Sequence, residues 1–323
     1  MPPTSPSSSE PAVCKRLAKS FARLYAHTVL RPLLHIDPRA SFDVSGRYEL
    51  RDAVYAEEPQ PVRISVIGDS CALGLGVRAR DEAPAGVVAR SVVRELGRPV
   101  DLQVCAAVGT GTFGLARCVA KARQHRPHVA LFVVGGNDTL LPLPVRWAAR
   151  RLGGYVSELA ARGTSVVVTT SPDTGSSGLF SRPVRAFLTW RSRRTGALQA
   201  VHAVRHGARV ASLADPAFRE RPHELLSADR FHPSAAGYAR QCARIALDVV
   251  AAAGGPAPED SARPRELPLR RAARLAARTQ DAHLTSSTTP GRAVLSVRPP
   301  GAAAAPPPSR ARRGAPQYAE APR

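Results

Sequence analysis

From Val62 onward, short apolar runs alternate along the chain with longer stretches in which apolar residues have helical spacing. The apolar runs cover residues 62–68, 100–108, 128–136, 164–171 and 208–215. The helical candidates lie near residues 80–97, 112–126, 143–162, 182–206 and 233–253. Strands with so few polar positions are typical of a parallel sheet that helices cover on both faces. The pattern predicts one doubly wound α/β domain over residues 62–254, built on a five-stranded parallel sheet.

The residues before this domain show two other patterns. Residues 1–13 are rich in proline and serine, which predicts disorder. In residues 14–34, large apolar side chains recur every four positions among basic ones, as in an amphipathic helix. This helix is expected to pack on the domain, and attachment to a membrane surface or to a partner is the alternative. It opens an N-terminal segment, residues 14–61, which continues as an irregular connection with one short strand.

The chain after Gly254 changes composition once more. Residues 255–323 combine many arginines with prolines and alanines, including the run AAAAPPP. This composition predicts a disordered basic tail that contains at most a short helix within residues 266–278.

The formal net charge of +21 comes almost entirely from arginine, since only Lys15, Lys19 and Lys121 are lysines. Such a charge permits weak association of the basic tail or the N-terminal helix with an anionic surface, either a membrane or a nucleic acid. The sequence contains no specific nucleic-acid-binding motif. Net charge bears on non-specific binding and does not indicate a fold.

The five cysteines are an odd number and none forms a C-x-x-C pair, which argues against a disulfide framework and a zinc site. No His, Asp and Glu cluster has metal-ligand spacing, so neither a metal nor another cofactor is expected. The first twenty residues lack the apolar core of a secretory signal. No apolar run reaches the roughly 18 residues of a membrane span. The sequence therefore predicts a cytoplasmic protein, for which peripheral attachment to a membrane stays open.

The first apolar run ends in Gly68-Asp69-Ser70 and continues into the glycine-rich segment CALGLGV. A serine hydroxyl at the end of a buried strand can act as a nucleophile once a nearby base accepts its proton. Gly, Asp and Ser are also common turn residues, so an ordinary turn is the alternative. Asp69 is expected to cap the turn and to have no catalytic role.

Among the histidines, His232 stands out because Asp229 precedes it by three residues and Pro233 follows it. Proline favours the first position of a helix, which places His232 near a helix N-terminus. Across a tight turn Asp229 can bind one ring nitrogen and leave the other free as a base. The alternative is that both side chains merely cap the helix.

Two further loops that follow apolar runs are rich in glycine. The third run ends in residues 135–138 (GGND), where the amide of Asn137 can donate to an oxyanion. The second run leads into AAVGTGTFG, where backbone N–H groups at Gly109 and Gly111 can also donate. Each loop can equally be an ordinary strand-to-helix turn. In a doubly wound sheet the ends of the first three strands lie side by side, so these loops and Ser70 are expected at one rim.

In this order, the four segments resemble the four sequence blocks of the SGNH hydrolases, also called the GDSL esterase/lipase family. The matching segments are residues 68–70 (GDS), 109–111 (GTG), 135–138 (GGND) and 229–232 (DRFH). The resemblance covers roughly residues 62–253 and implies the flavodoxin-like sheet of that family. Two positions depart from the family pattern. Residues 105–107 (CAA) lack its usual asparagine, and Cys71 replaces a leucine and is expected to be a small buried residue rather than a nucleophile.

The resemblance implies a catalytic triad in which Ser70 is the nucleophile, His232 the base and Asp229 the orienting acid. The implied oxyanion donors are the N–H groups of Ser70 and Gly111, with Gly109 as the alternate, and the side chain of Asn137. The expected activity is hydrolysis of an acyl or acetyl ester of a small molecule. An acyl or acetyl transferase with the same triad is one alternative. A catalytically silent module that binds an anionic membrane or nucleic acid is the other.

Overall fold

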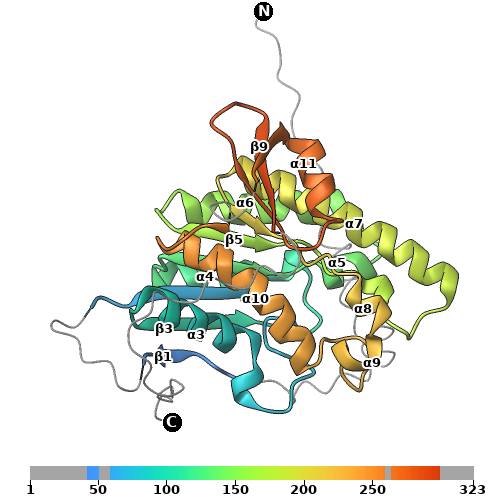
Figure 1. Cartoon of the computed structure of the whole chain (residues 1–323), viewed down its shortest axis with the longest axis horizontal. Helices are drawn as coiled ribbons and strands as arrows, with labels where there is room; N and C mark the ends of the chain where they lie inside the picture. Colours follow the sequence, from blue (N-terminus) through green and yellow to red (C-terminus); the bar gives the residue numbers. More distant parts are fainter. Residues whose placement is uncertain (1–41, 51–58, 259–262, 299–323) are drawn as a thin grey trace, which may run out of the picture.

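The structure is a computed structural model in which residues 42–50, 59–258 and 263–298 are described (Figure 1). The segments predicted as disordered (1–13) and as an amphipathic helix (14–34) lie outside the described residues. The strands are β1 (Gly46–Tyr48), β2 (Val62–Gly68), β3 (Val100–Ala106), β4 (Val129–Val133), β5 (Ser165–Thr169), β6 (Arg209–Ala211), β7 (Arg265–Pro268), β8 (Ala282–Ser286) and β9 (Arg292–Val297). The α-helices are α3 (Pro84–Leu96), α4 (Ala116–His125), α5 (Gly136–Leu140), α6 (Val145–Ala160), α7 (Arg182–Arg205), α8 (Ala217–Glu220), α9 (Pro222–Leu225), α10 (Ala235–Ala252) and α11 (Leu269–Ala276).

The strands form a mixed sheet of nine strands in the order β1-β3-β2-β4-β5-β6-β8-β9-β7. The five central strands, from β3 to β6, are parallel, and their order is that of a flavodoxin-like doubly wound sheet. β1 adds an antiparallel strand beside β3, and β8, β9 and β7 extend the other edge in antiparallel fashion. The predicted parallel sheet is confirmed as the centre of the fold, but the predicted number of five strands was too low.

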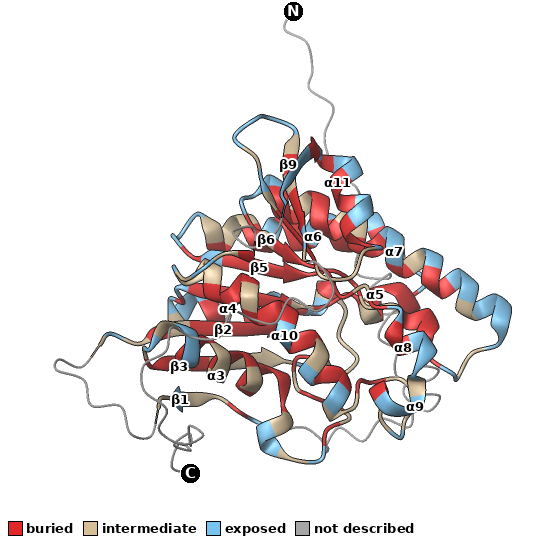
Figure 2. Ribbon diagram, viewed as in Figure 1, coloured by how far each residue is buried: buried red, intermediate tan, exposed pale blue. Residues whose placement is uncertain are grey.

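Alternate residues of the central strands belong to two separate hydrophobic cores. Val66 and Leu131 pack with residues of α3 and α10, whereas their neighbours Ile67 and Phe132 pack with residues of α4, α6 and α7. Figure 2 shows the buried residues concentrated in the strands and on the inward sides of these helices. Because helices cover both faces, successive strand residues are all buried, and this explains the continuous apolar runs in the sequence.

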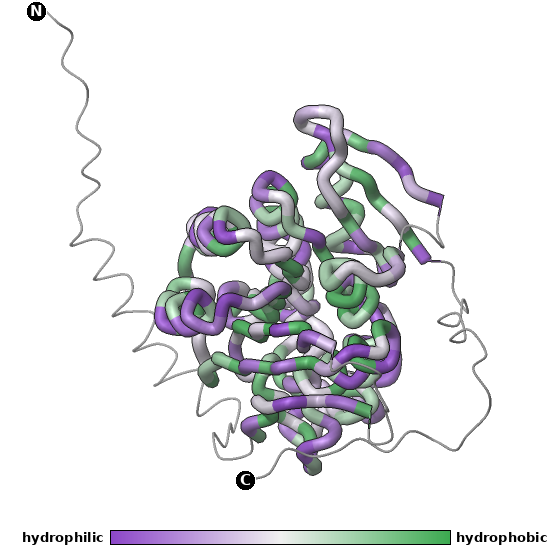
Figure 3. Tube along the Cα trace, turned by 90° about the vertical axis from the view of Figure 1, so that its left-hand side faces the viewer, coloured by the Kyte–Doolittle hydropathy of each residue, from purple (hydrophilic) through white to green (hydrophobic). Residues whose placement is uncertain are grey.

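The prediction of a disordered tail from residue 255 onward was wrong for residues 263–298. These residues form β7, α11, β8 and β9, which lie at the top of the molecule in Figure 1 and in the view turned by 90° in Figure 3. The open hydrogen-bonding edge of β6 pairs with β8, where Val210 lies opposite Leu284. In α11, Ala272 and Ala276 are fully buried. An alanine-rich composition therefore reflects a helix whose small side chains allow close packing, and the domain extends past residue 254.

The first three parallel strands in the chain bring their carboxyl ends together, because β2 lies between β3 and β4. The loops that follow these strands therefore meet at one rim of the sheet. None of the helices in the described ranges combines the length and the hydropathy needed to cross a bilayer.

Candidate active site

Ser70 lies in a tight turn directly after β2. A Cβ atom on Gly68 would lie 2.2 Å from the carbonyl oxygen of Val133, so only glycine fits at the end of this strand. The next residue, Asp69, donates its N–H to the same carbonyl and accepts the N–H of Cys71 with its side chain, at 3.2 and 2.9 Å. This turn holds Ser70 at the rim with 4% of its surface exposed.

His232 is held by a second turn, between α9 and α10. Oδ1 of Asp229 accepts the backbone N–H groups of Phe231 and His232, both at 2.9 Å, and so shapes the turn. The helix cap is Ser234, whose hydroxyl accepts the Gly237 N–H, and α10 begins only at Ala235. The sequence-based placement of the helix start at Pro233 was therefore early by two residues. Asp229 and His232 precede the cap, which argues against the alternative that they merely cap the helix.

Asp229, His232 and Ser70 form one continuous line of hydrogen bonds. Oδ2 of Asp229 lies 2.6 Å from Nδ1 of His232, and Nε2 of His232 lies 2.9 Å from Oγ of Ser70. Burial alone raises the pKa of Asp229, but its hydrogen bonds to His232, Ser227 and the Phe231 N–H, with the charge of His232, lower it to about 2. Asp229 is therefore ionised at neutral pH, and it holds the ring so that Nε2 faces Ser70.

Asn137 and Asp138, at the start of α5, connect the loops after β3 and β4. The side-chain amide of Asn137 donates to the carbonyl of Thr110 at 3.0 Å and to Asp69 at 3.3 Å. Asp138 accepts the N–H and the hydroxyl of Thr112 at 2.9 and 2.6 Å. Three of these four hydrogen bonds hold residues 110–112 against the site, and the fourth joins Asn137 to the turn that carries Ser70.

Gly111 does not point its N–H toward Asn137 in this arrangement. The carbonyl of Thr110 faces the Asn137 amide, and the peptide that joins Thr110 to Gly111 is trans. In a trans peptide the N–H and the C=O point in opposite directions, so the Gly111 N–H points away from that amide. A Cβ on Gly111 would lie 2.6 Å from Asp138, so close packing accounts for this glycine. The alternate, Gly109, has a φ of 71°, which explains why glycine suits that turn.

Asp69 is a buried carboxyl group beside the site. Its burial raises the pKa to about 7, and the charge of Asp138 adds to this effect. Hydrogen bonds from the Cys71 N–H and Asn137, together with the charge of His232, act in the opposite direction. A carboxyl group that changes its charge near neutral pH thus accepts a hydrogen bond from Asn137.

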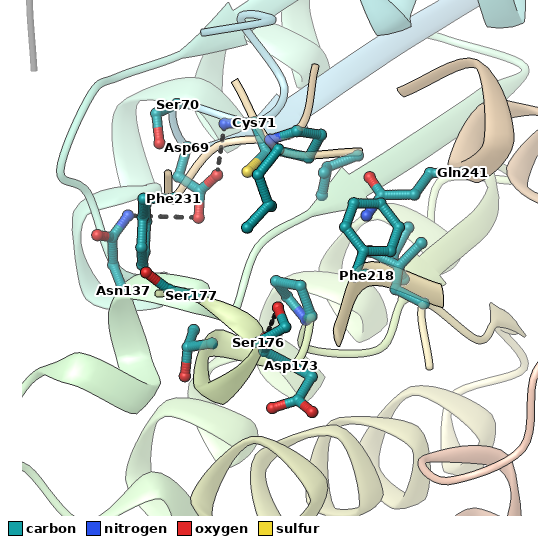
Figure 4. A pocket seen from close by; sticks show the side chains of 18 of the residues that line it. Asp69, Ser70, Cys71, Asn137, Asp173, Ser176, Ser177, Phe218, Phe231 and Gln241 are labelled. Atoms are coloured by element: carbon teal, nitrogen blue, oxygen red, sulfur yellow. Dashed lines mark hydrogen bonds between the residues drawn. The ribbon is translucent and has the colours of Figure 1, made fainter. Parts of the chain in front are cut away.

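A cavity of about 50 Å³ opens beside Ser70 and extends between the loops after β4, β5 and β6. In Figure 4 it runs from Ser70 and Asn137 on one side to Phe218 and Gln241 on the other. Its apolar wall consists of Val133, Val134, Leu213, Phe218, Leu226 and Phe231, and its hydroxyl groups come from Thr174, Ser176 and Ser177. Within the described ranges, no three His, Cys, Asp or Glu side chains are grouped so that they could hold a metal ion.

Residues 66–240, which are more than half of the chain, match the GDSL-like lipase/acylhydrolase family. The chain belongs to this family. The recognition of the SGNH, or GDSL, family from four sequence blocks is therefore confirmed. Members of this family are esterases and lipases, so the expected enzyme class is confirmed at the level of the family.

This GDSL hydrolase is similar to the GDSL-like esterase Rv1075c of Mycobacterium tuberculosis (strain ATCC 25618 / H37Rv), with 32% identity over 188 residues. The match covers 57% of this chain and 60% of the relative, so the chain spans about three fifths of that protein's length. Among solved structures, it is similar to the lipase/acylhydrolase from Enterococcus faecalis, with 23% identity, a TM-score of 0.45 and coverage of 58% and 95% of the two chains. A member of the lipolytic G-D-S-L family from Veillonella parvula DSM 2008 shows 18% identity, a TM-score of 0.47 and coverage of 58% and 97%.

Three residues that support this GDSL site were not assigned this role from sequence. Asp69 accepts from Asn137, Asp138 holds the loop at Thr112, and Ser227 donates to Asp229 at 2.7 Å. Asp69 and Asp138 lie next to residues that the sequence did single out, so adjacency was the available signal. Ser227 had no such signal, since its contact depends on the shape of the turn.

Proposed function

We propose that this protein hydrolyses carboxylic esters, with Ser70 as the nucleophile and His232 as the general base. The observation that carries the proposal is the line of hydrogen bonds, 2.6 and 2.9 Å long, that joins Asp229 to His232 and His232 to Ser70. Oγ of Ser70 attacks the ester carbonyl carbon while Nε2 of His232 takes the hydroxyl proton. The same proton then passes to the leaving alcohol oxygen as the carbon–oxygen bond breaks, and an acyl-Ser70 remains. Water attacks this ester with the same assistance and releases the acid.

The neighbouring thiol is a poor alternative nucleophile. Cys71, which was expected to be buried, is only partly buried in the structure, but the desolvation of its thiol and the charge of Asp69 raise its pKa well above the ordinary value. Because the thiolate is the reactive form, a cysteine in this environment stays unreactive. The hydroxyl of Ser70 has a base within 2.9 Å.

We assign two donors to the oxyanion that forms during the reaction, the Ser70 N–H and the Asn137 amide. No group in the described part of the chain accepts the Ser70 N–H, which leaves this donor available. Asn137 would exchange its longer hydrogen bond, 3.3 Å to Asp69, for one to the oxyanion. The Gly111 N–H would join them only after its peptide turned over. Loss of one oxyanion donor typically costs about 10²–10³ in turnover.

The central test is the replacement of the Ser70 hydroxyl. We expect Ser70→Ala to lower kcat for 4-nitrophenyl acetate by at least about 10⁴, because the nucleophile is absent. A fluorophosphonate, which reacts with activated serines, is expected to label wild-type protein on the Ser70 peptide and to leave the variant unlabelled. Ser91→Ala, on the outer part of α3, is the matched control and should behave like wild type. Parent-like turnover by Ser70→Ala would refute the mechanism.

The size of the cavity beside Ser70 supports a short acyl group. A cavity of about 50 Å³ has room for about four water-sized groups. The side chain of Thr169 lies behind the wall of this cavity, fully buried, and its hydroxyl has no hydrogen-bond partner among the described residues.

We therefore expect kcat/KM to fall by about tenfold or more between the butyrate and the decanoate ester of 4-nitrophenol. Forcing extra methylenes into a filled pocket costs about 1–3 kcal/mol. A series of esters of increasing chain length measures this directly. Equal kcat/KM values across the series would contradict the size limit. They would not bear on the proposed triad, because Ser70→Ala would still abolish the hydrolysis of each ester.

A further inference from the structure

The first half of α7 carries a group of large hydrophobic side chains that face solvent. Val184, Phe187 and Trp190 have exposed fractions of 42, 53 and 53%. They are spaced three residues apart and therefore lie along one side of the helix. The rings of Phe187 and Trp190 are neighbours, with centroids 5.9 Å apart. We call Val184, Phe187 and Trp190 the α7 patch.

Only positive charge surrounds the α7 patch along the helix. Arg182, Arg193 and Arg194 are exposed beside it, and the guanidinium of Arg194 lies 5.7 Å from the centre of the Trp190 ring. No acidic residue occurs anywhere between Asp173 and Asp215. The neighbouring helix α6 repeats this combination, with Arg146 stacked on the exposed Trp147 at 5.9 Å.

The opposite side of α7 is held firmly, so the patch is not exposed by a loose helix. Leu188 is buried in a cluster with Leu140 and Leu141. The guanidinium of Arg191 donates to the carbonyls of Thr139 and Leu141 at 2.7 and 2.6 Å. The first half of α7 nevertheless projects beyond the sheet, at the right of Figures 1 and 2, with its exposed side outward.

The helix that bears the patch also contacts the wall of the active site. Phe180 and Phe231 pack against the cluster that contains Leu188. Phe231 lines the cavity, and its ring meets the His232 ring edge-on at 5.1 Å. Apolar side chains thus connect the inner side of α7 with the catalytic histidine.

We propose that the α7 patch docks this protein on an anionic lipid surface. Aromatic side chains on such a helix settle at the boundary between headgroups and acyl chains, while arginines contact the headgroup phosphates. A second copy of the chain is a poor occupant, because a symmetric contact would bring the same arginines together. The N-terminal segment of this chain is also a poor occupant, because residues 14–34 are themselves basic. An anionic bilayer supplies both the apolar layer and the opposite charge.

The two tryptophans of the chain provide the test. In Trp147→Phe, Trp190 is the single tryptophan and reports only on the patch. We expect its emission to shift to the blue when phosphatidylcholine vesicles containing phosphatidylglycerol are added, and to be quenched when the lipids carry brominated acyl chains. Vesicles of phosphatidylcholine alone should leave the emission unchanged. Higher salt should weaken binding, because the charges involved are exposed.

Variants of the patch then separate its two contributions. Phe187→Ser in the Trp147→Phe background should weaken vesicle binding by about tenfold, since it removes an exposed aromatic ring that would insert into the bilayer. Vesicle binding should weaken by about fivefold in each of Arg182→Gln, Arg193→Gln and Arg194→Gln. This is the change in affinity expected when one arginine near the membrane surface is lost. The controls are Leu275→Ser on α11 and Val297→Ser on β9, which have comparable exposure of 37 and 38%. We expect both controls to bind vesicles like the reference, and all variants to hydrolyse soluble esters like the parent.

Several results would overturn the proposal. Emission typical of a buried indole before vesicles are added would mean that another segment covers the patch. A dimer in sedimentation velocity that Phe187→Ser dissociates would assign the patch to a second copy. An equal emission shift with duplex DNA, without quenching by brominated lipids, would favour a nucleic acid. Unchanged vesicle binding by Phe187→Ser would place the lipid contact elsewhere in the chain.

Discussion

At the level of single residues, Asp229 binds the His232 ring with one carboxylate oxygen and the backbone of its own turn with the other. The spacing of three residues in the sequence predicts the first contact, because a tight turn brings the two side chains together. The second contact explains why the turn keeps that shape. The pKa of the Asp229 carboxyl is about 2, so this group stays charged across the whole pH range in which an esterase is assayed.

The pKa of Asp69 is shifted in the opposite direction from that of Asp229, and this leads to a prediction about folding stability. The pKa of Asp69 is raised to about 7 in the folded protein, against an ordinary value of 3.8. The folded state therefore holds this proton more tightly than the unfolded state, and folding stability falls as pH rises from about 4 to 7. A shift of this size corresponds to about 4 kcal/mol once Asp69 is fully ionised. Because asparagine does not ionise, we expect Asp69→Asn not to lose this folding stability as the pH rises.

The measurement is urea unfolding of wild-type protein and Asp69→Asn at pH 5 and pH 8. The difference in the free energy of unfolding, wild type minus variant, should become more negative by about 2–3 kcal/mol between these pH values, because part of the loss already occurs below pH 5. Ser91→Ala should give the same difference from wild type at both pH values. A pH-independent difference for Asp69→Asn would mean that Asp69 titrates at its ordinary pKa.

At the level of elements, the C-terminal strands complete the sheet that the parallel strands begin. β6 is three residues long and exchanges hydrogen bonds with β8 on its outer side. Arg244 of α10 binds Asp281, just before β8, and also Asp215, at 2.5 Å. Ion pairs buried in this way are costly to break, because a charge is then left without a partner. The C-terminal elements are therefore part of the hydrolase domain.

We expect removal of residues 255–323 to abolish folding. Buried side chains of the main core, among them Leu284 and Leu295, would be lost, and each large-to-small change of this kind costs about 2–5 kcal/mol. The four buried leucines of this segment, Leu267, Leu269, Leu284 and Leu295, together account for about 8–20 kcal/mol, which is as large as the roughly 5–15 kcal/mol by which domains are stable. Circular dichroism and the soluble fraction on expression measure the outcome.

Removal of residues 299–323 alone is the matched control for this truncation. Because the sheet ends at Val297, the shorter truncation should leave the melting temperature unchanged. A cooperative melt at the parental temperature after removal of residues 255–323 would show that the C-terminal strands are dispensable.

At the level of the whole molecule, four aspartates are buried and serve the interior of the fold. Asp69, Asp138, Asp215 and Asp248 are buried, where they hold turns or pair with arginine or histidine. The arginines of α7 lie in a segment that contains no acidic residue, so no nearby Asp or Glu in the sequence can pair with them. The formal net charge of +21 reflects an excess of arginine over acidic residues, and the α7 patch lies in a segment that has arginines and no acidic residue.

The sequence by itself determined the five parallel strands, the helices between them and the order of the four site segments. Each rests on a local signal: an apolar run, helical spacing, or a polar residue at the end of a strand. The residues of α7 were predicted almost to the end, as 182–206 against the observed Arg182–Arg205.

Only the tertiary structure decided which groups from distant parts of the chain meet. The pairing of β8 with β6, the orientation of the Gly111 N–H and the exposure of Phe187 and Trp190 all depend on residues far away in the chain. Composition made residues 263–298 look disordered because arginine, proline and alanine are common in disordered chains. In the fold, β8 pairs with the open edge of β6, and the alanines of α11 are buried in the main core beside this extended sheet. Local patterns thus specify elements, whereas contacts between distant elements specify which side chains are buried, which donors converge and which surfaces stay open.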